Sequence, residues 1–379
     1  METLKIAIFC WESLYAERVG GLAPAATNLA EILAHDHEVH YFTRGSVPDQ
    51  EINGVEYHYC QPQGRNIVEY CDSMSRGMVE NFHRFDISGR FDYLHFNDWH
   101  AVQALHLLQD RNTILTYHST EYGRSGNTFG DWWEFGEISG KEWYGGLIAK
   151  RVTAVSASLK SEVMRLYHVP DWKCDVVPNG IVPGLYQARV DAGEVKQAYG
   201  VGPSAPLILF IGRLAYQKGP DLLVEAMKTV HQEDRDAHLI VVGEGDMRQM
   251  LVEKAKDLPV TFTGYIPDSE YVRLLNAGDL VVIPSRNEPF GLVLLEAWSA
   301  ERGVVASNVG GLSENIETSI DGVTVEPEPN PLAWGIGSVI DDPSASVLLG
   351  KRGRKKVECS FRWGPVGEKI LETYSRVVT

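Results

Sequence analysis

Short hydrophobic runs alternate along the chain with longer stretches in which apolar residues recur every three or four positions. The run Lys5–Cys10 predicts a buried strand, and Ala25–Ala34 has the 3.6-residue period of an amphipathic helix. Further strands in the first half are predicted at Glu38–Thr43, Val55–Cys60, Tyr93–Phe96, Thr113–His118 and Val152–Ser156. The helices predicted between them are Ile67–Phe85, His100–Gln109 and Ser139–Lys150. Buried strands separated by helices indicate a parallel sheet covered by helices on both faces.

The same alternation restarts after a turn-rich stretch from Pro178 to Gly184, which we interpret as an interdomain linker. The strands predicted in the second half are Leu207–Ile211, His238–Val242, Val260–Thr263, Leu280–Ile283 and Val304–Ser307. The predicted helices are Asp221–His231, Met247–Ala255, Ser269–Asn276 and Leu292–Ala300. A chain of 379 residues exceeds the roughly 250–300 residues over which one core keeps growing. The sequence therefore predicts two doubly wound α/β domains, residues 1–180 and 181–359.

Charge and cysteine content narrow the class of protein. The formal net charge is −16, with 51 acidic against 35 basic residues, and this weighs against nucleic acid as a partner. The five cysteines are widely spaced and form no C-x-x-C pair, which favours a reducing compartment over a disulfide framework or a zinc site.

The N-terminus has no signal-peptide pattern, and the longest apolar stretches are far too short to cross a bilayer. We therefore expect a cytoplasmic protein without membrane association. These features do not predict an oligomeric state.

Loops that leave the carboxyl ends of strands carry the ligands in doubly wound sheets. After the first predicted strand, Arg18 is followed by Gly20 and Gly21, which lead into a helix. Paired glycines at such a turn let backbone amides approach an anion, and the helix dipole adds attraction. A tight turn without a ligand explains the glycines equally well.

The second half carries a stronger pattern at its first strand end. Gly212 and Arg213 end the strand, and Lys218 follows five residues after the arginine. A planar guanidinium fork and a mobile ammonium suit a diphosphate. Surface salt bridges are the alternative for these two cations.

A later strand-to-helix turn contains Glu288 and, eight positions on, Glu296. Carboxylates are effective acceptors for the hydroxyl groups of a sugar or a ribose. Three backbone amides at the helix start can hold a phosphate: those of Phe290, Gly291 and Leu292. The alternative is an ordinary helix with one acidic residue before it and one on its exposed face.

Gly212-Arg213 with Lys218, together with the E-x7-E frame from Glu288 to Glu296, resembles the retaining glycosyltransferases of the GT-B fold, particularly family four. The resemblance covers nearly the whole chain. It implies two Rossmann-like domains facing a deep cleft, with a C-terminal helix, about residues 360–379, that crosses back onto the first domain. The segment that begins at Arg18 also resembles the Lys-x-Gly-Gly-Leu motif of glycogen and starch synthases, with arginine in place of lysine.

The resemblance also implies roles in the second domain. Arg213 and Lys218 would neutralise the diphosphate of a nucleotide-sugar donor as it leaves. Glu296 would bind the ribose, and Glu288 would contact the transferring sugar. The remaining donor-binding residues implied in this way are Arg18, Gly20, Gly21, Gly212, Gly243, Glu244, Phe290, Gly291 and Leu292.

His118 ends a predicted strand in a T-x-H segment, which in this family lies beside the anomeric carbon. The resemblance therefore implies that His118 acts at the catalytic centre by positioning and charge stabilisation, whereas a lone histidine at a strand end is otherwise structural. Asn97 stands where glycogen synthases have a histidine that reaches the active site. Four residues are predicted to contact the acceptor, with core packing as the alternative: Asp98, Trp99, Trp132 and Trp133.

The sequence thus predicts a hexosyltransferase that retains the anomeric configuration and moves a hexose, with glucose on ADP or UDP favoured, to a glycan or a small-molecule acceptor. Alternatives are a family-four enzyme with a mannose or N-acetylglucosamine donor and a small or lipid-linked acceptor, a phosphorylase, an epimerase, or a non-catalytic nucleotide-sugar-binding protein. No cofactor beyond the nucleotide sugar and no metal requirement are expected. The one D-x-D string considered, Asp234-Arg235-Asp236, is predicted to be solvated surface.

Overall fold

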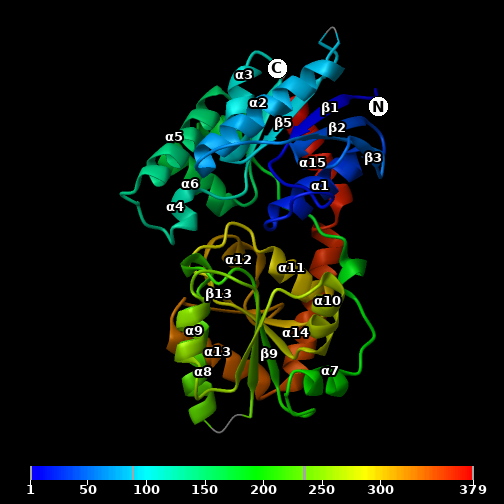
Figure 1. The fold of residues 1–379 in the computed structure, drawn as a ribbon. Coiled ribbons are helices and arrows are strands. Elements are labelled where there is room, and N and C mark those ends of the chain that lie inside the picture. Colours follow the sequence, from blue (N-terminus) through cyan, green and yellow to red (C-terminus); the bar gives the residue numbers. More distant parts are fainter. Residues whose placement is uncertain (1, 88, 234–235, 378–379) are drawn as a thin grey trace. The chain divides into compact units, whose positions relative to one another are not determined.

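The computed structural model describes residues 2–87, 89–233 and 236–377, and internal contacts divide them into two units (Figure 1). The first unit runs to Tyr122, resumes from Thr128 to Gly180, and includes the chain from Trp363 on. The second unit spans Ile181–Arg362 and also takes Gly123–Asn127. Among the described residues, no helix is both long enough and apolar enough to span a bilayer.

The first unit contains an eight-stranded sheet in the order β3-β4-β2-β1-β5-β6-β7-β8. Its strands are β1 (Lys5–Phe9), β2 (Glu38–Arg44), β3 (Gln50–Ile52), β4 (Val55–Cys60), β5 (Tyr93–Asn97), β6 (Thr113–Tyr117), β7 (Arg151–Ala154) and β8 (Cys174–Val176). All neighbouring strands are parallel except the β3–β4 hairpin. The strand order reverses beside β1, and doubly wound sheets bind ligands at such a point.

Helices connect these parallel strands. They are α1 (Leu22–Leu33), α2 (Ile67–Phe85), α3 (Val102–Leu107), α5 (Trp133–Ile148) and α6 (Ala157–Tyr167). The unit also contains α15 (Trp363–Ser375), which follows the second unit in the sequence and connects no strands. The short α4 (Glu121–Arg124) is divided between the units, and 3₁₀ turns occur at Trp99–Ala101 and Asp171–Lys173.

The second unit has a six-stranded, entirely parallel sheet in the order β11-β10-β9-β12-β13-β14. Its strands are β9 (Leu207–Ile211), β10 (His238–Val242), β11 (Val260–Gly264), β12 (Leu280–Ile283), β13 (Gly303–Ser307) and β14 (Val323–Val325). Its helices are α7 (Ala192–Ala198), α8 (Pro220–Gln232), α9 (Arg248–Lys254), α10 (Asp268–Ala277), α11 (Leu292–Ser299), α12 (Gly310–Asn315), α13 (Pro329–Ile340) and α14 (Pro343–Ser360). Further 3₁₀ turns occur at Pro183–Tyr186 and Tyr216–Lys218.

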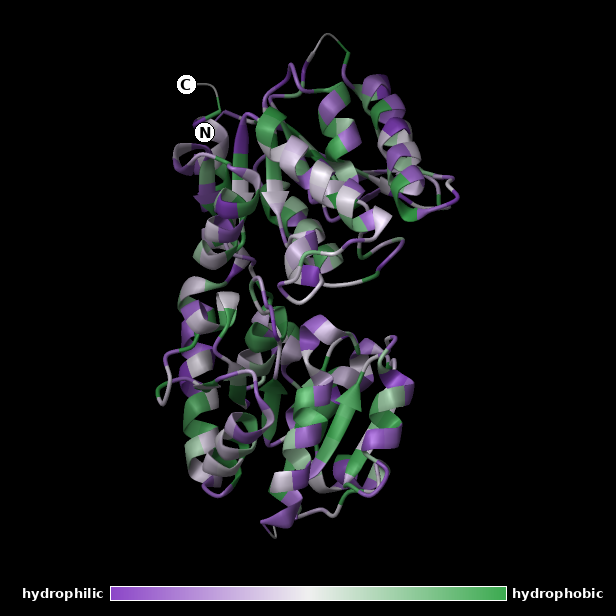
Figure 2. Ribbon diagram, turned by 90° about the vertical axis from the view of Figure 1, so that its left-hand side faces the viewer, coloured by the Kyte–Doolittle hydropathy of each residue, from purple (hydrophilic) through white to green (hydrophobic). Residues whose placement is uncertain are grey.

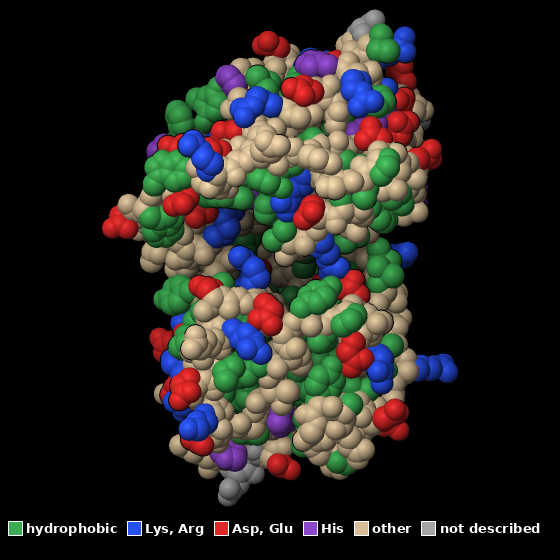
Figure 3. Space-filling view, in the orientation of Figure 1, with side chains coloured by type: hydrophobic (Ala, Val, Ile, Leu, Met, Phe, Trp, Pro, Cys, Tyr) green, Lys and Arg blue, Asp and Glu red, His purple; other side chains and the backbone are tan. Residues whose placement is uncertain are grey.

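Each unit is held by its own core, because strands buried on both faces need apolar residues throughout. In the second unit, strands β9 and β12 are buried along almost their whole length, and α8 and α13 pack against the same cluster. Figure 2 shows this distribution, with hydrophobic strands enclosed by helices that also carry hydrophilic residues. On the face shown in Figure 3, acidic and basic side chains are interspersed over the surface.

The predicted α/β class is confirmed, and several element boundaries differ from those predicted. Helix α5 begins at Trp133, six residues before the predicted start at Ser139. Trp132 is therefore the helix N-cap and Trp133 its first residue, whereas the predicted helix began beyond both. All five cysteines are free thiols, and the D-x-D string falls partly outside the described residues.

The C-terminal helix α15 belongs to the first unit and contributes to its core. Tyr374 stacks on Tyr93 with ring centroids 5.0 Å apart, and its hydroxyl lies 2.8 Å from Nδ1 of His95. The other ring nitrogen of His95 is 2.6 Å from the hydroxyl of Thr116. Through these two contacts the fully buried His95 links α15 to the centre of the sheet.

Burial lowers the pKa of His95 to about 3, and the nearby His118 adds to this effect. The folded pKa lies below the unfolded value of about 6.5, so the stabilisation is complete above that pH and is lost as the pH falls toward 3. We expect the melting temperature to fall between pH 7 and pH 5, and to fall less steeply in His95→Gln. Calorimetry over a pH series measures this slope. An equally reduced slope in the exposed-site control His83→Gln would contradict the assignment.

Candidate functional site

Three loops meet at the carboxyl edge of the second unit's sheet, since β10, β9 and β12 are neighbours. They begin at Gly243, Gly212 and Pro284, at the ends of these three strands. The sequence predicted donor-binding residues on each of these loops, and the topology brings the loops together at the point where the strand order reverses. Helices α11 and α12 begin at the same edge (Figure 1).

Glycines allow the first two loops to approach each other closely. Gly212 has φ +150° and Gly243 has φ +131°, which are conformations that side chains disfavour. A Cβ on Gly243 would lie 2.0 Å from the carbonyl oxygen of Gly212. The amide of Leu214 donates to the carbonyl of Glu244 at 2.9 Å and ties the loops together. The side chain of Glu244 is largely exposed and forms a 3.4 Å ion pair with Arg248.

Lys218 and Glu288 form the charged centre of this edge. Lys218 Nζ donates to Glu288 Oε2 at 2.8 Å, and the hydroxyl of Ser285 donates to the same oxygen at 3.0 Å. Glu288 is only 8% exposed, whereas the side chain of Lys218 is 25% exposed. A buried carboxylate needs such partners. The ammonium has three donor protons, so it can bind an anion while it keeps this ion pair.

Arg213 is exposed beside this pair, and its guanidinium donates to Gln217 Oε1 at 3.3 Å. A second arginine, which the sequence analysis did not select, stabilises the loop itself. Arg286 forms two hydrogen bonds with Asp221, of 2.8 and 2.7 Å, and covers the ring of Tyr216 at 3.9 Å. Arg286 is therefore a structural residue in this structure, while Arg213 is accessible to an anion.

Glu296 lies in the second turn of α11 and accepts two tyrosine hydroxyls. Tyr186 donates to Oε1 at 3.2 Å and Tyr271 donates to Oε2 at 2.5 Å. Burial, together with the adjacent carboxylate, raises the pKa of Tyr271 well above its usual value. A carboxylate has about four lone-pair positions, which makes it an effective acceptor for hydroxyl groups.

The N-terminus of α11 supplies backbone amides at the same edge. Gly291 is its N-cap, with φ +97° and no side-chain capping bond, and Leu292 is its first residue. The first N–H groups of a helix lack intrahelical acceptors and favour anions. Phe290 is 4% exposed and packs near Phe361, so its side chain fixes the turn and its backbone remains the part suited to a ligand.

In the first unit, His118 directly follows β6 and is oriented by the neighbouring strand. Its Nε2 lies 3.0 Å from Asn97 Oδ1, and the Asn97 amide group donates to the carbonyl of Phe9 at 3.3 Å. Because an amide oxygen only accepts, Nε2 carries the proton and Nδ1 is left as an acceptor. Burial lowers the pKa of His118, which favours the neutral ring. Asn97, which the sequence marked only as a departure from glycogen synthases, is thus a positioning residue for His118.

Two of the predicted acceptor residues are packed within the first unit. Asp98 is 4% exposed, adopts φ +55°, and accepts the backbone amide of His118 at 2.7 Å. Trp99 is also 4% exposed and stacks on His100 with centroids 4.2 Å apart. Trp132 and Trp133 are 46% and 53% exposed. The structure therefore gives Asp98 and Trp99 a packing role and leaves the other two tryptophans accessible.

The predicted glycine loop is held by an acidic residue that the sequence analysis missed. Glu12 is buried, and its Oε2 accepts the amides of Val19 and Gly20, the latter at 3.0 Å. Burial raises the pKa of Glu12. The amide of Gly20 is therefore engaged in this structure, while Arg18 and Gly21 lie on the exposed side of the loop.

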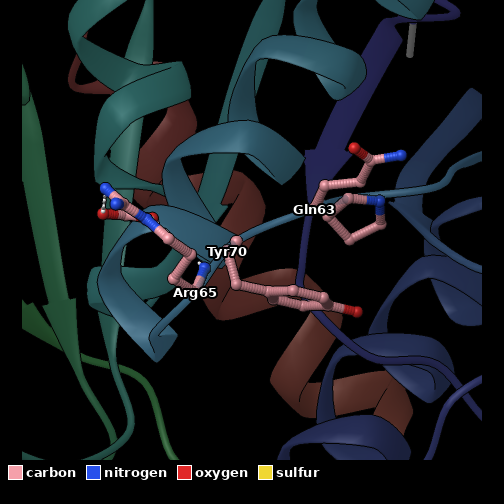
Figure 4. A pocket seen from close by; sticks show the side chains of 6 residues that line it. Gln63, Arg65 and Tyr70 are labelled. Carbon is pink, nitrogen blue, oxygen red and sulfur yellow. Dashed lines mark hydrogen bonds and ion pairs between the residues drawn. The ribbon is translucent and has the colours of Figure 1, made fainter.

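The sequence analysis also missed a group of side chains around Arg44, the last residue of β2. The guanidinium of Arg44 covers the ring of Trp11 at 4.2 Å, donates to the Trp11 carbonyl at 2.7 Å, and donates to the Tyr70 hydroxyl at 3.2 Å. Tyr70 lines a shallow pocket of about 570 Å³ together with Gln63 and Arg65 (Figure 4). The lining also includes Glu69, which pairs with Arg65 at 2.7 Å. An aromatic ring beside polar side chains suits a sugar ring.

Removal of the acceptor that orients His118 gives a specific test. We expect Asn97→Ala to lower kcat about fivefold, since one hydrogen bond contributes about 1 kcal/mol and about 1.4 kcal/mol is a factor of ten. Asn97→Asp, which keeps an acceptor, should restore much of the rate. In a His118→Ala background, Asn97→Ala should have little further effect. Independent, additive losses would contradict this positioning role.

Comparisons with known proteins agree with this arrangement. The model of group 1 glycosyl transferases matches residues 191–356, and the model of glycosyltransferase family 4 matches residues 19–184. An uncharacterized glycosyltransferase of Methanocaldococcus jannaschii is 33% identical over 98% of this chain and 98% of its own length. The glycogen synthase of Mycobacterium tuberculosis is 30% identical over 82% of this chain and 76% of its own length.

Solved structures show the same fold at lower sequence identity. Sucrose-phosphate synthase from Thermosynechococcus elongatus has a TM-score of 0.81 and 23% identity, with 99% of each chain covered. Anabaena HepE, solved with UDP and glucose, has a TM-score of 0.76 and 20% identity, with 98% of this chain and 99% of its own covered. The chain therefore belongs to the group 1 glycosyltransferases of family 4, and its two parallel-sheet units are those of the GT-B fold.

Proposed function

We propose that the protein is a hexosyltransferase that retains the anomeric configuration and takes glucose from a nucleoside diphosphate donor. The observation that carries this proposal is the convergence of Arg213, Lys218 and Glu288 with the start of α11 at one edge of the second sheet. Two cations and a helix N-terminus are suited to a diphosphate, and a carboxylate beside them is suited to sugar hydroxyls.

The proposed transfer needs only donor and acceptor. The bond between the anomeric carbon and the diphosphate oxygen breaks, and the acceptor hydroxyl forms the new bond on the same face. The proton of that hydroxyl passes to the departing diphosphate, which keeps the bonding electrons. Arg213 and Lys218 stabilise the negative charge that develops there. No metal ion is needed for this step, because the two side chains supply the positive charge.

Glu296 in the second unit and His118 in the first are each proposed to bind hydroxyl groups. Glu296 can accept ribose hydroxyls, as it accepts the hydroxyls of Tyr186 and Tyr271. His118, as a neutral ring, can accept a sugar hydroxyl at Nδ1. Both are positioning interactions, whose contribution comes from orientation rather than bond formation.

Relatives support glucose as the transferred sugar. A glycogen synthase is among the matches at 30% identity, and solved structures of the fold hold UDP with glucose in HepE and ADP with acarbose in starch synthase IV. An α-maltose-1-phosphate synthase of Mycobacterium tuberculosis is 28% identical over 75% of this chain. We therefore propose an α-glucan or a phosphorylated sugar as the acceptor. The exposed tryptophans and the pocket lined by Tyr70 and Gln63 are the acceptor surfaces to test.

A donor screen followed by product analysis tests the proposal. ADP-, UDP- and GDP-sugars are first compared for thermal stabilisation, and the best donor is then incubated with α-glucan or glucose 1-phosphate. We expect one nucleoside diphosphate glucose to stabilise the protein and the product to carry an α-linkage by proton NMR. A β-linked product would exclude retention. A mannose or N-acetylglucosamine product would exclude glucose, and an epimerised donor without transfer would exclude the transferase mechanism.

A further inference from the structure

A cluster of histidines and carboxylates lies on the first unit's sheet, away from the carboxyl edge where His118 lies. His40 is the third residue of β2, and Glu56 and His58 lie on β4. The register pairs His40 with Glu56, and residues two apart on a strand share a face, so all three side chains lie on one face of the sheet. Both imidazoles are 2% exposed, while Glu56 retains about half of its side-chain exposure.

Each imidazole is fixed at its outer nitrogen by a separate carboxylate. His40 Nε2 lies 3.0 Å from Glu38 Oε1, and His58 Nδ1 lies 3.0 Å from Asp49 Oδ2. The second oxygen of Asp49 accepts the amide of Tyr59 at 3.2 Å, which orients that carboxylate. Ionised carboxylates only accept, so both outer nitrogens carry protons.

The two inner nitrogens therefore face each other as acceptors. His40 Nδ1 and His58 Nε2 are 2.9 Å apart. Glu56 Oε2 lies 3.7 Å from the first and 4.0 Å from the second. Three lone-pair-bearing atoms thus converge from two strands, and either a proton held between the rings or a metal cation among the three atoms offsets their mutual repulsion.

We propose that His40, His58 and Glu56 bind one divalent transition-metal ion, with Zn²⁺ as the best fit. Two imidazoles and one carboxylate form a ligand set that suits zinc, with water as a fourth ligand. Bond lengths of about 2.0–2.1 Å place the ligand atoms of a tetrahedral ion roughly 3.4 Å apart. The observed separations of 2.9, 3.7 and 4.0 Å bracket this value.

The surroundings are those of a structural metal site. Carboxylates behind ligating histidines fix the tautomer and strengthen the ligand, as Glu38 and Asp49 do here. Phe85, at the end of α2, lies over His58 with centroids 4.1 Å apart, and Phe91 packs edge-on against His40 at 5.0 Å. These two phenylalanine rings cover the side of the cluster that faces the protein interior. Because Glu56 faces solvent, the ion would enter past Glu56. The ion would link β2 to β4.

Metal binding to the full-length chain, prepared without a polyhistidine tag and stripped with a chelator, tests the proposal. We expect about one Zn²⁺ per chain after dialysis, and a melting temperature raised by roughly 5 °C at a hundredfold excess over Kd. Co²⁺ in place of Zn²⁺ should give the visible absorption of a four-coordinate ion. Absence of both retained metal and a thermal shift would overturn the proposal, since a proton shared by the rings would then account for their contact.

Variants separate this site from incidental binding to surface histidines. Glu56→Gln removes one ligand at a half-exposed position and should weaken Zn²⁺ binding about tenfold or more, with the metal-free melting temperature little changed. His58→Gln should abolish the Co²⁺ spectrum. The matched control His83→Gln removes an exposed histidine elsewhere in the unit and should leave binding unchanged. Equal affinity in the wild type and Glu56→Gln would overturn the assigned ligand set.

Discussion

Replacing Lys218 by alanine is expected to lower kcat for sugar transfer by about 10²–10³-fold, the range observed when a single charge-stabilising donor is removed from an active site. The physical reason is that, in the proposed mechanism, Lys218 offers its charge where the diphosphate leaves, and its 2.8 Å ion pair with Glu288 holds the lysine in place. The loss should fall mainly on kcat, because charge on the diphosphate grows as the bond breaks. Steady-state kinetics with the preferred donor measure this.

The chain offers a matched control for that substitution. Lys228 pairs with Glu225 at 2.7 Å, but both side chains are more than 40% exposed. Lys228→Ala removes a lysine–glutamate pair of the same kind and should leave kcat within a factor of two, since exposed pairs contribute little. Melting curves for both variants show whether each is folded at the assay temperature. A folded Lys218→Ala variant with wild-type kcat would contradict the role assigned to this lysine.

Gly310→Ala is expected to destabilise the second unit and to reduce transfer sharply, although residue 310 has no side chain to contribute. Gly310 has φ +50°, and a Cβ there would lie 2.1 Å from the carbonyl oxygen of Glu288. The same oxygen accepts the amide of Gly311 at 2.8 Å. The loop that carries Glu288 must move, and backbone strain of this kind costs about 1–3 kcal/mol before the contact itself is counted. We expect kcat to fall at least about tenfold.

Calorimetry and kinetics on the same preparation separate the two effects of Gly310→Ala. The melting temperature should fall by roughly 5–10 °C, at about 2–4 °C per kcal/mol for a domain of this size. Gly184→Ala is the control, because a Cβ at Gly184 meets no atom within 4 Å and its backbone needs no positive φ. Wild-type stability and kcat in Gly310→Ala would show that the Glu288 loop does not depend on this close approach.

The sequence predicted the central strands and the edge strand β11 well, but it missed the short strands at other sheet edges. Strands β1, β9 and β12 were recognisable because strands buried on both faces read as continuous apolar runs. The strands that were not predicted are β3, β8 and β14, each three residues long and each at a sheet edge. Three residues give too little periodicity to distinguish a strand from a loop.

Helix α5 was predicted too short for a related reason. Gly136 and Gly140 lie in its first two turns, and glycine lowers helix propensity by about 1 kcal/mol relative to alanine. Tertiary packing of Phe135 and Ile138 compensates for these glycines, and the local sequence does not reveal that packing. Helix α6 could have been found, since Ser156 caps it by accepting the amide of Leu159.

Site residues that are close together in the sequence were predicted, whereas partners from distant segments were not. Gly212, Arg213 and Lys218 were identifiable because they are close in sequence and follow a clear strand. The partners that orient Gly20 and His118 in the first unit were not identifiable from the sequence. Glu12 reaches the Gly20 amide across a loop, and Asn97 reaches His118 from the neighbouring strand. Such contacts depend on strand order, which a single sequence does not specify.

The most direct test of the central claim is the release of nucleoside diphosphate, followed with and without acceptor. With the donor that stabilises the protein most, the account predicts slow release alone and a large increase when an α-glucan or a phosphorylated sugar is added, with one glycosidic bond formed per nucleotide released. Release that no carbohydrate or phosphorylated acceptor accelerates, from a donor that nonetheless binds, would contradict sugar transfer as the function of this site.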